Sequence, residues 1–217
     1  MAQTLQTKGM VTVTASRVDR LANWIISVSI YDENGRVIQA KSYNPDGKVT
    51  DIATTQYGFA GQVIRTMHRQ RVAQTTPQTL VTVTESEFDA IGRPAKTNKR
   101  QGHVYGASLT PALSAPKTIA EVKYDALGQV KNKKLGANLE ELTYDYNIRG
   151  WLLGVNRAFV TTAKTGAPLA GKWFGFDLGY DKTNNASSNG YNAAQYNGNI
   201  SGQSWRSAGD QVARQYD

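Results

Sequence analysis

The sequence predicts an all-β fold in which antiparallel hairpins stack side by side into a curved sheet. Three observations predict it: polar and apolar residues alternate along several segments, glycine and aromatic residues are frequent, and a short turn pattern recurs. The chain of 217 residues contains 20 Gly, 11 Tyr and 4 Trp, and no long segment shows the apolar period of a helix. Strands joined by tight turns are the simplest reading of this pattern.

Segments of alternating character are expected to form the strands. In residues 24–30, 118–125 and 140–146, every second side chain is apolar or aromatic, so these side chains share one face of a sheet. Trp24 falls in phase with the aliphatic side chains of its segment, and we therefore expect it in the core. A hairpin cannot bury its own face, so stacking against neighbouring hairpins is expected to provide the burial.

A five-residue turn pattern separates several of these segments, at intervals of about 16–36 residues. Tyr or Phe comes first, Asp follows, and Gly stands three residues after the Asp. The Asp side chain is expected to accept hydrogen bonds from turn amides, and the Gly to adopt a positive φ. We expect a longer turn in the last full copy. The predicted turn residues are Tyr31, Asp32, Gly35, Phe88, Asp89, Gly92, Tyr124, Asp125, Gly128, Tyr144 and Asp145.

The residues indicate no catalytic, cofactor-binding or metal site, and we predict a protein that is not an enzyme. The absence of Cys excludes disulfides, thiolate metal sites and cysteine nucleophiles. His68 and His103 are the only histidines, and neither has a second ligand at a metal-binding spacing. The chain contains neither a phosphate-binding glycine loop nor a nucleophile elbow.

The net charge of +8 indicates a basic protein. Its denser basic clusters, at residues 96–100 and 131–134, fall in or beside predicted strands and turns, and no basic helix contains them. We interpret them as solvated hairpin surface, which disfavours nucleic-acid binding. No apolar run approaches the ~18 residues of a membrane span, and no signal peptide is visible at the N-terminus.

Two tryptophans leave an alternative function open. Trp151 and Trp205 follow turns and begin or lie within predicted strands, so either face of the sheet is open to them. Exposed aromatic rings stack on sugars or occupy interfaces. A carbohydrate-binding or adhesive surface module, with surface glycans as partners, is therefore the alternative to a purely structural role.

The turn motif resembles the hallmark of the YD-repeat, or Rhs (rearrangement hotspot), proteins, in which Tyr-Asp-x-x-Gly is followed by Arg or Gln and then Val. The likeness extends over about residues 10–217. Three stretches in order, YDYNIRGWLLGVN, FGFDLGYD and AQYNGNISGQSWRS, resemble the large Rhs-type repeat proteins of Bacteroidetes.

This resemblance implies a wall segment of a spiral β-shell. It implies a non-enzymatic structural role in a secreted or cell-surface polymorphic-toxin or contact protein, located outside the cell or on its surface. The partners it implies are neighbouring Rhs repeats of a longer chain and an enclosed toxin domain. Residues 1–217 are expected to form a single repeat region, a fragment of a longer shell, because neither a self-cleaving core segment nor a toxin domain is recognisable.

Overall fold

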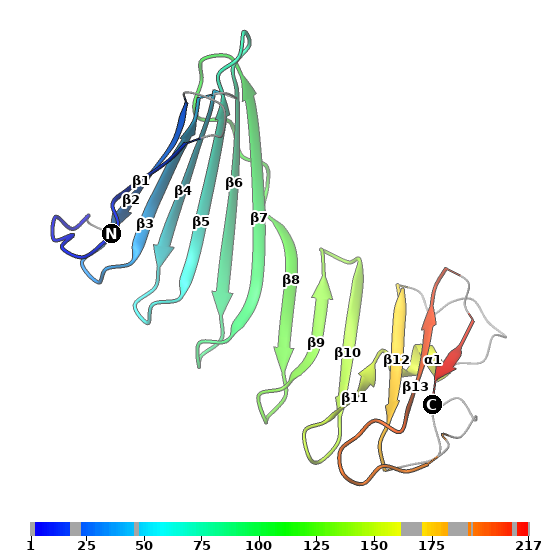
Figure 1. Ribbon diagram of the computed structural model, residues 1–217. Helices are drawn as coiled ribbons and strands as arrows, with labels where there is room; N and C mark the ends of the chain where they lie inside the picture. Colours follow the sequence, from blue (N-terminus) through cyan, green and yellow to red (C-terminus); the bar gives the residue numbers. More distant parts are fainter. Residues whose placement is uncertain are drawn as a thin grey trace. The chain divides into compact units, whose positions relative to one another are not determined.

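The computed structural model describes residues 3–17, 23–45, 48–161, 171–181, 191, 193–209 and 212–216. Within these residues the chain forms antiparallel strands and one short helix (Figure 1), which confirms the predicted all-β class. The chain divides into two compact units, Met1–Thr118 and Ile119–Asp217, here called unit 1 and unit 2. No helix in the described part of the chain is long and apolar enough to cross a membrane.

Unit 1 is a meander in which each strand pairs with the next one along the chain. Its strands are β1 (Val13–Arg17), β2 (Trp24–Tyr31), β3 (Val37–Asn44), β4 (Val49–Tyr57), β5 (Val63–Val72), β6 (Gln78–Phe88) and β7 (Pro94–Tyr105). The turns after β2, β4 and β6 all lie at one end of the strands, because an antiparallel meander returns to the same end after every second strand.

One face of β6 is buried under the Gly/Ala/Pro-rich segment 106–116. Thr79, Val81 and Val83 share this face at alternate positions and are 0%, 6% and 1% exposed. The Thr79 hydroxyl donates to the carbonyl of Ser108, and a Cβ on Gly102 would lie 2.5 Å from the carbonyl oxygen of Ala112. The segment therefore lies directly against the sheet, and Gly102 permits the close approach.

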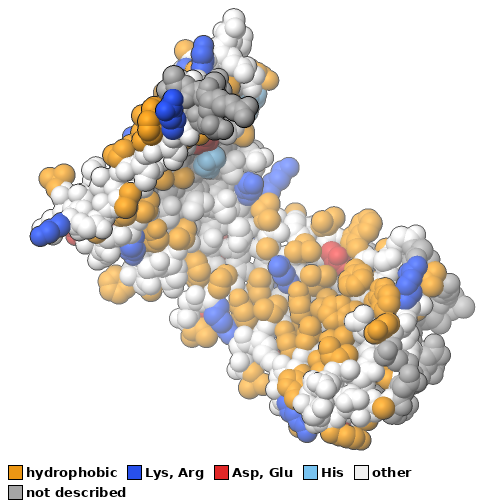
Figure 2. Space-filling view, viewed as in Figure 1, with side chains coloured by type: hydrophobic (Ala, Val, Ile, Leu, Met, Phe, Trp, Pro, Cys, Tyr) orange, Lys and Arg blue, Asp and Glu red, His pale blue; other side chains and the backbone are white. Residues whose placement is uncertain are grey.

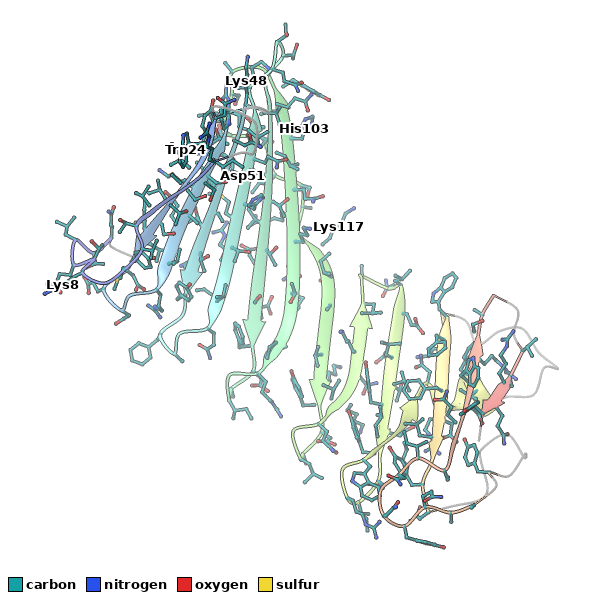
Figure 3. All side chains as sticks on the ribbon, viewed as in Figure 1. Lys8, Trp24, Lys48, Asp51, His103 and Lys117 are labelled. Atoms are coloured by element: carbon teal, nitrogen blue, oxygen red, sulfur yellow. The ribbon has the colours of Figure 1, made fainter. Side chains whose placement is uncertain are left out.

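Trp24 does not lie in the core that its strand phase predicts. Trp24, labelled in Figure 3, is 49% exposed. Ile26, on the same face, is 44% exposed. The alternation that predicts a shared face holds, but the side chains at this end of the strand are largely open to solvent. Sequence phase specifies which side chains share a face, whereas their burial depends on what packs against it.

Unit 2 is also a meander with strands paired in sequence order. From Ile119 onwards it contains most of β8 (Lys117–Tyr124), then β9 (Val130–Leu135), β10 (Glu140–Tyr146), β11 (Leu152–Val155), helix α1 (Arg157–Thr161), β12 (Phe174–Gly179), β13 (Gly202–Ser207) and β14 (Arg214–Tyr216). Here helix α1 and Tyr191 cover part of the sheet.

The core of unit 2 forms where α1 packs on β12 and β13. Phe159 and Val160 of the helix are 3% and 1% exposed, and Tyr191 is 3% exposed. Arg206 of β13 lies 5.9 Å from the centre of the Phe159 ring and donates to the Phe159 carbonyl. A Cβ on Gly179 would lie 2.3 Å from the Tyr191 ring, so a glycine is required where this tyrosine crosses the strand.

Candidate functional site

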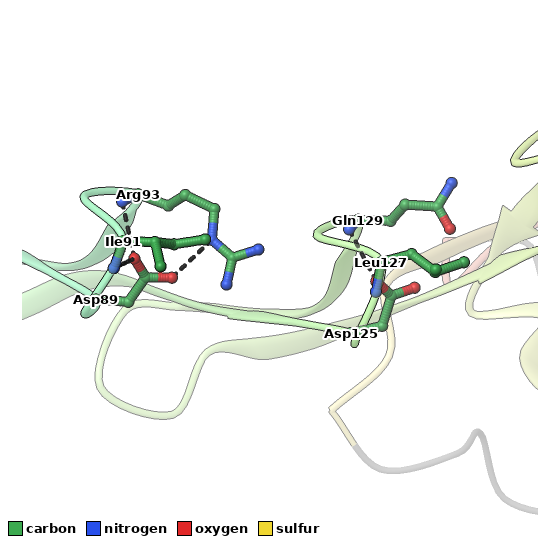
Figure 4. A network of polar contacts seen from close by, with 6 residues as sticks. All are labelled: Asp89, Ile91, Arg93, Asp125, Leu127 and Gln129. Atoms are coloured by element: carbon green, nitrogen blue, oxygen red, sulfur yellow. Dashed lines mark hydrogen bonds and ion pairs between the residues drawn. The ribbon is translucent and has the colours of Figure 1, made fainter.

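The turn at Asp89 defines the repeated feature of this chain (Figure 4). Asp89 Oδ1 accepts hydrogen bonds from the backbone N–H groups of Ile91 and Arg93, at 3.1 and 2.9 Å. The Gly92 N–H donates to the Asp89 carbonyl at 3.0 Å, and the Asp89 N–H donates to the Arg93 carbonyl at 2.9 Å. This is a three-residue hairpin loop built on a type I turn with a glycine bulge.

Glycine is required at the fourth position of the turn because the backbone there is left-handed. Gly92 has φ +86°, and Gly35 and Gly128 have φ +74° and +85°. An L-residue with a Cβ is strained in this region, whereas Gly enters it freely. The bulge has the same geometry in all three turns, which explains the fixed three-residue spacing between Asp and Gly.

Asp32 and Asp125 form the same arrangement. Asp32 Oδ1 accepts from the N–H groups of Asn34 and Arg36, both at 2.9 Å. Asp125 Oδ1 accepts from the N–H groups of Leu127 and Gln129, also at 2.9 Å (Figure 4). Each carboxylate satisfies two turn amides that the hairpin itself leaves without a partner.

The fourth copy of the turn begins at a different residue from the one expected. Tyr144 and Asp145 lie inside β10, and the turn begins two residues later, at Asn147. Asn147 Oδ1 accepts from the N–H groups of Arg149 and Trp151 at 2.9 Å, and Gly150 has φ +80°. Asparagine offers the same acceptor oxygen as aspartate, and Gly150 stands three residues after Asn147 but five after Asp145. The turn is therefore not a longer version but the same turn in another frame.

Two of the aspartates also form ion pairs within their own turns. Arg36 Nε and Arg93 Nε donate to the Oδ2 atoms of Asp32 and Asp89 at 2.8 and 2.6 Å. Burial of Asp32 opposes its ionisation, but the bonds from Arg36 and Asn34 outweigh it and lower the pKa of that carboxyl. Hydrogen bonding from the Arg93 backbone, strengthened by its guanidinium, lowers the pKa of Asp89. Both carboxylates are therefore held in the charged form.

Tyrosines at or next to the ends of several strands link their hairpin to the one before it, a contact that we call the tyrosine staple. The hydroxyls of Tyr31 and Tyr57 donate to the carbonyls of Val11 and Val37, at 2.7 and 3.0 Å. In unit 2, the same staples join Tyr146 to Val130 at 3.1 Å and Tyr180 to Leu152 at 3.0 Å. In all four staples the acceptor lies two residues after a positive-φ glycine of the preceding turn.

The residue after the glycine makes a second link between neighbouring turns. Gln129 Nε2 donates to the Gly150 carbonyl at 3.2 Å. Arg36 places its guanidinium 4.6 Å from the centre of the Tyr57 ring, within cation–π range. Neighbouring turns in each unit are thus joined by side chains of the motif itself as well as by the strands.

The staples were missed by reasoning from the sequence, which assigned the aromatic residue only to packing on the sheet. A signal was present, because the first position of the motif is Tyr in most copies and Phe only at position 88. A preference for Tyr over Phe in a series of repeats indicates a use for the hydroxyl.

The two tryptophans considered for sugar binding are both half-buried. Trp151 packs on Tyr180, with ring centres 5.3 Å apart, and the Arg149 guanidinium lies 5.1 Å from the Trp151 ring centre. A Cβ on Gly198 would lie 3.1 Å from Trp151 Cζ2. Trp205 lies within β13 and is also half-buried. Trp151 is thus enclosed by neighbours on the turn edge, as a packing residue would be.

The acidic side chains and histidines engage neighbours on the sheet. Glu85 pairs with Arg100 at 2.7 Å and with Arg65 at 3.5 Å. His68 lies 3.7 Å from Asp51, while His103 packs edge-on against Tyr105. In the ranges that the structure describes, no group of three or more His, Cys, Asp or Glu side chains is arranged to hold a metal ion.

A buried asparagine cross-links the strands of unit 2. Asn156 is 4% exposed and has φ +48°, a left-handed conformation. Its Oδ1 accepts from the Thr143 N–H at 3.1 Å, and its Nδ2 donates to Glu140 Oε1 and to the Phe174 carbonyl, at 3.0 and 2.8 Å. These bonds connect β10, the end of β11 and β12, and they satisfy the buried amide.

A pocket of about 150 Å³ lies beside this asparagine and is lined in part by Asp145, Arg157 and Lys172. Arg157 pairs with the buried Asp177, and Lys172 donates to the Glu141 carbonyl and to Asn156. The basic groups of the pocket are thus used within the fold, and the volume is below the roughly 300 Å³ at which ligand pockets begin.

No protein-family model matches the chain, and no curated protein matches it. The functional conclusion therefore depends on the geometry of the turns and on the resemblance of their motif.

Proposed function

We propose that the chain is a non-enzymatic structural segment, a wall of stacked hairpins in a Rhs-type shell of a secreted or cell-surface polymorphic-toxin or contact protein. The observation that supports it is the tyrosine staple, which ties a hairpin to its predecessor at an equivalent backbone position in both units. A catalytic site needs polar groups directed at a substrate, whereas these hydroxyls are directed at the preceding hairpin.

The physical logic of this role is that of a repeat protein. Stability is the sum of each hairpin's own turn and its contacts with its neighbours, so the array extends without a central core. Gly128 and Asp125 stabilise the turn, and Gln129 reaches the next one. Such a sheet grows by adding hairpins, and it curves because neighbouring strands are twisted.

The partners in this proposal are the neighbouring repeats of a longer chain, with an enclosed toxin domain as cargo. Both follow from the resemblance of the turn motif to YD-repeat proteins. The extracellular or cell-surface location follows from the same resemblance.

The test compares Asp89→Ala with Glu87→Ala, two acidic residues that lie two positions apart. Asp89 bonds two turn amides, whereas the Glu87 side chain is 60% exposed. If the turns are structural, Asp89→Ala lowers the thermal midpoint of the β-sheet circular dichroism signal and Glu87→Ala leaves it nearly unchanged. Equal midpoints for the two variants would contradict a structural role for the turn.

A glycan array separates the structural proposal from the sugar-binding alternative. The structural proposal predicts no sugar-dependent binding by the wild-type chain. Sugar binding that is lost in Trp151→Ala or Trp205→Ala, while circular dichroism shows the fold retained, would favour the alternative.

A further inference from the structure

The turns of unit 2 present apolar side chains at their tips. Leu127 and Ile148 are 82% and 102% exposed, although both are large aliphatic residues. Tyr196, in the next turn of the same edge, is 74% exposed. We call these three residues the tip row.

The three turns of the tip row lie next to one another. The turn of Leu127 is joined to that of Ile148 by the bond from Gln129 to the Gly150 carbonyl. The turn of Tyr196 follows, because its Gly198 lies against the Trp151 ring. The exposed side chains therefore form one line along one edge of unit 2.

The tip row contributes little to the stability of the turns that present it. Asp125 and Asn147 hold their turns through backbone amides, and these bonds are independent of the side chains at the tips. Type I turns accept most residues at these positions, and polar ones are common there. Large apolar residues at consecutive tips therefore indicate an interaction surface.

Basic side chains flank two of the three turns of the tip row. Lys123 and Lys131 flank the turn of Leu127 and are exposed, and Arg149 is exposed within the turn of Ile148. The nearby Asp125 carboxylate is directed at its own turn amides. Figure 2 shows hydrophobic and basic side chains beside each other along the lower edge of this unit. The surface therefore combines apolar tips with net positive charge.

We propose that the tip row inserts into the surface of a lipid bilayer that contains anionic lipids. Apolar side chains enter the boundary between headgroups and acyl chains, and basic side chains behind them attract anionic headgroups. Three separate side chains offer about a few hundred Å² at most, below the roughly 600 Å² that each partner buries in the smallest stable protein interfaces. A fluid bilayer accommodates isolated tips without a matching rigid surface.

Trp151 and Tyr146 are placed as interfacial aromatics usually are, directly behind the tips. Both are half-buried, and Tyr146 donates its hydroxyl to a backbone carbonyl. Aromatic residues with a polar group are enriched at the headgroup level of membranes. Unit 1 repeats the exposed tips with Phe59 and Ile91, which are 109% and 75% exposed.

Cosedimentation with vesicles tests the proposal on the full chain of 217 residues. The wild-type chain is expected to bind phosphatidylcholine vesicles that contain phosphatidylserine more tightly than vesicles of phosphatidylcholine alone. The triple variant Leu127→Ser, Ile148→Ser, Tyr196→Ser is expected to bind at least about tenfold more weakly. The double variant Lys123→Gln, Lys131→Gln is expected to lose the preference for phosphatidylserine.

The matched control is Leu139→Ser. Leu139 is 61% exposed at the turn between β9 and β10, which lies at the opposite end of the strands. This variant is expected to bind as the wild-type chain does, and all variants are expected to share one thermal midpoint because the changed side chains are exposed.

The proposal is overturned if the wild-type chain fails to bind phosphatidylserine vesicles, or if the triple variant binds them equally well. Self-association that the triple variant abolishes, in a chain that binds no vesicles, would instead assign the tip row to contact with a second copy. None of these outcomes affects the structural proposal, whose test is the stability of Asp89→Ala.

Discussion

The two units bury their side chains in different ways. In unit 1, the fully covered part of the sheet is the stretch of β6 around Val81 and Val83, beneath segment 106–116. In unit 2, α1 packs on β12 and β13 and buries Phe159 and Val160. Elsewhere the described strands of unit 1 are mostly half-exposed, as a single layer must be.

This difference shows that hairpins with the same turn can be stabilised in two ways, by burial of apolar area or by hydrogen bonds alone. Where a second layer exists, burial of apolar area supplies the larger free energy. Where it does not, the strand ladder, the turn hydrogen bonds and the staples must hold the hairpins together, each with a modest contribution. Changes in the core of unit 2 and changes in the turns are therefore expected to differ in size.

The largest effect is expected in the core of unit 2, from Phe159→Ala. Phe159 is 3% exposed, and its removal loses apolar burial and leaves a cavity, which costs about 3–5 kcal/mol of unfolding free energy. Urea unfolding followed by tryptophan fluorescence measures the loss. Ile119→Ala, at a position that is 46% exposed, is the control and is expected to lose no more than about 1 kcal/mol. Equal losses would contradict the assignment of the core.

A smaller effect is expected from Gly128→Val. The valine would occupy φ +85°, a region that strains β-branched residues by about 1–3 kcal/mol. Gly209→Val is the control, because a Cβ there meets no atom closer than 4.0 Å and the residue has no left-handed φ. Denaturant midpoints of the two variants give the comparison, and a change near zero in Gly128→Val would count against the turn geometry.

The staple is expected to contribute about 0.5–1.5 kcal/mol, the usual net value of one hydrogen bond. Tyr57→Phe deletes the bond to the Val37 carbonyl and keeps the ring, so the unfolding free energy should fall by this amount. Phe88 provides the reverse experiment, because Phe88→Tyr adds a hydroxyl at the equivalent position of the motif. Phe88→Tyr is expected to stabilise the chain. If the variant were instead less stable, a hydroxyl at position 88 would not reach an acceptor in the preceding hairpin.

The smallest effect is expected from the charge of Asp89. The turn lowers the pKa of this carboxyl below its ordinary value of 3.8, so the folded chain holds the carboxylate better than the unfolded chain. The stabilisation is present above the ordinary value and is lost as the pH falls through the lowered pKa. Asp89→Asn keeps the Oδ1 acceptor, as Asn147 does naturally, but lacks the charge.

Urea unfolding of the wild-type chain and of Asp89→Asn at a series of pH values measures this contribution. The wild-type advantage is expected to be full near about pH 5 and to shrink as the pH falls to about 3 and below. An advantage that stays constant over this range would show that the charge contributes nothing.

Much of the fold could be predicted from the sequence because its determinants are local. Alternation over a few residues predicts a strand, and the three-residue spacing from Asp89 to Gly92 specifies a particular turn. The frame at Asn147 was within reach of the same rule, because Gly150 keeps that spacing from Asn147 and not from Asp145. The expectation followed the Tyr-Asp letters instead of the position of the glycine.

The remaining features depend on contacts between residues far apart in the chain. The staple from Tyr57 needs a carbonyl 20 residues earlier, and Arg206 meets the Phe159 carbonyl 47 residues away. The five residues of α1 are too few for a helical period to show, and tertiary packing determines their conformation. The exposure of Trp24 likewise depends on what packs against its face of the sheet, which strand phase does not reveal.

The central claim is that the turns are rigid, repeated structural units in both parts of the chain. Hydrogen exchange of backbone amides in the wild-type chain tests it most directly. Four turn amides donate hydrogen bonds to the Asp or Asn side chains: those of Arg36, Arg93, Gln129 and Trp151. The account predicts that these amides exchange as slowly as amides in the paired strands around them. Exchange of these four amides at the rate of an open loop would contradict it.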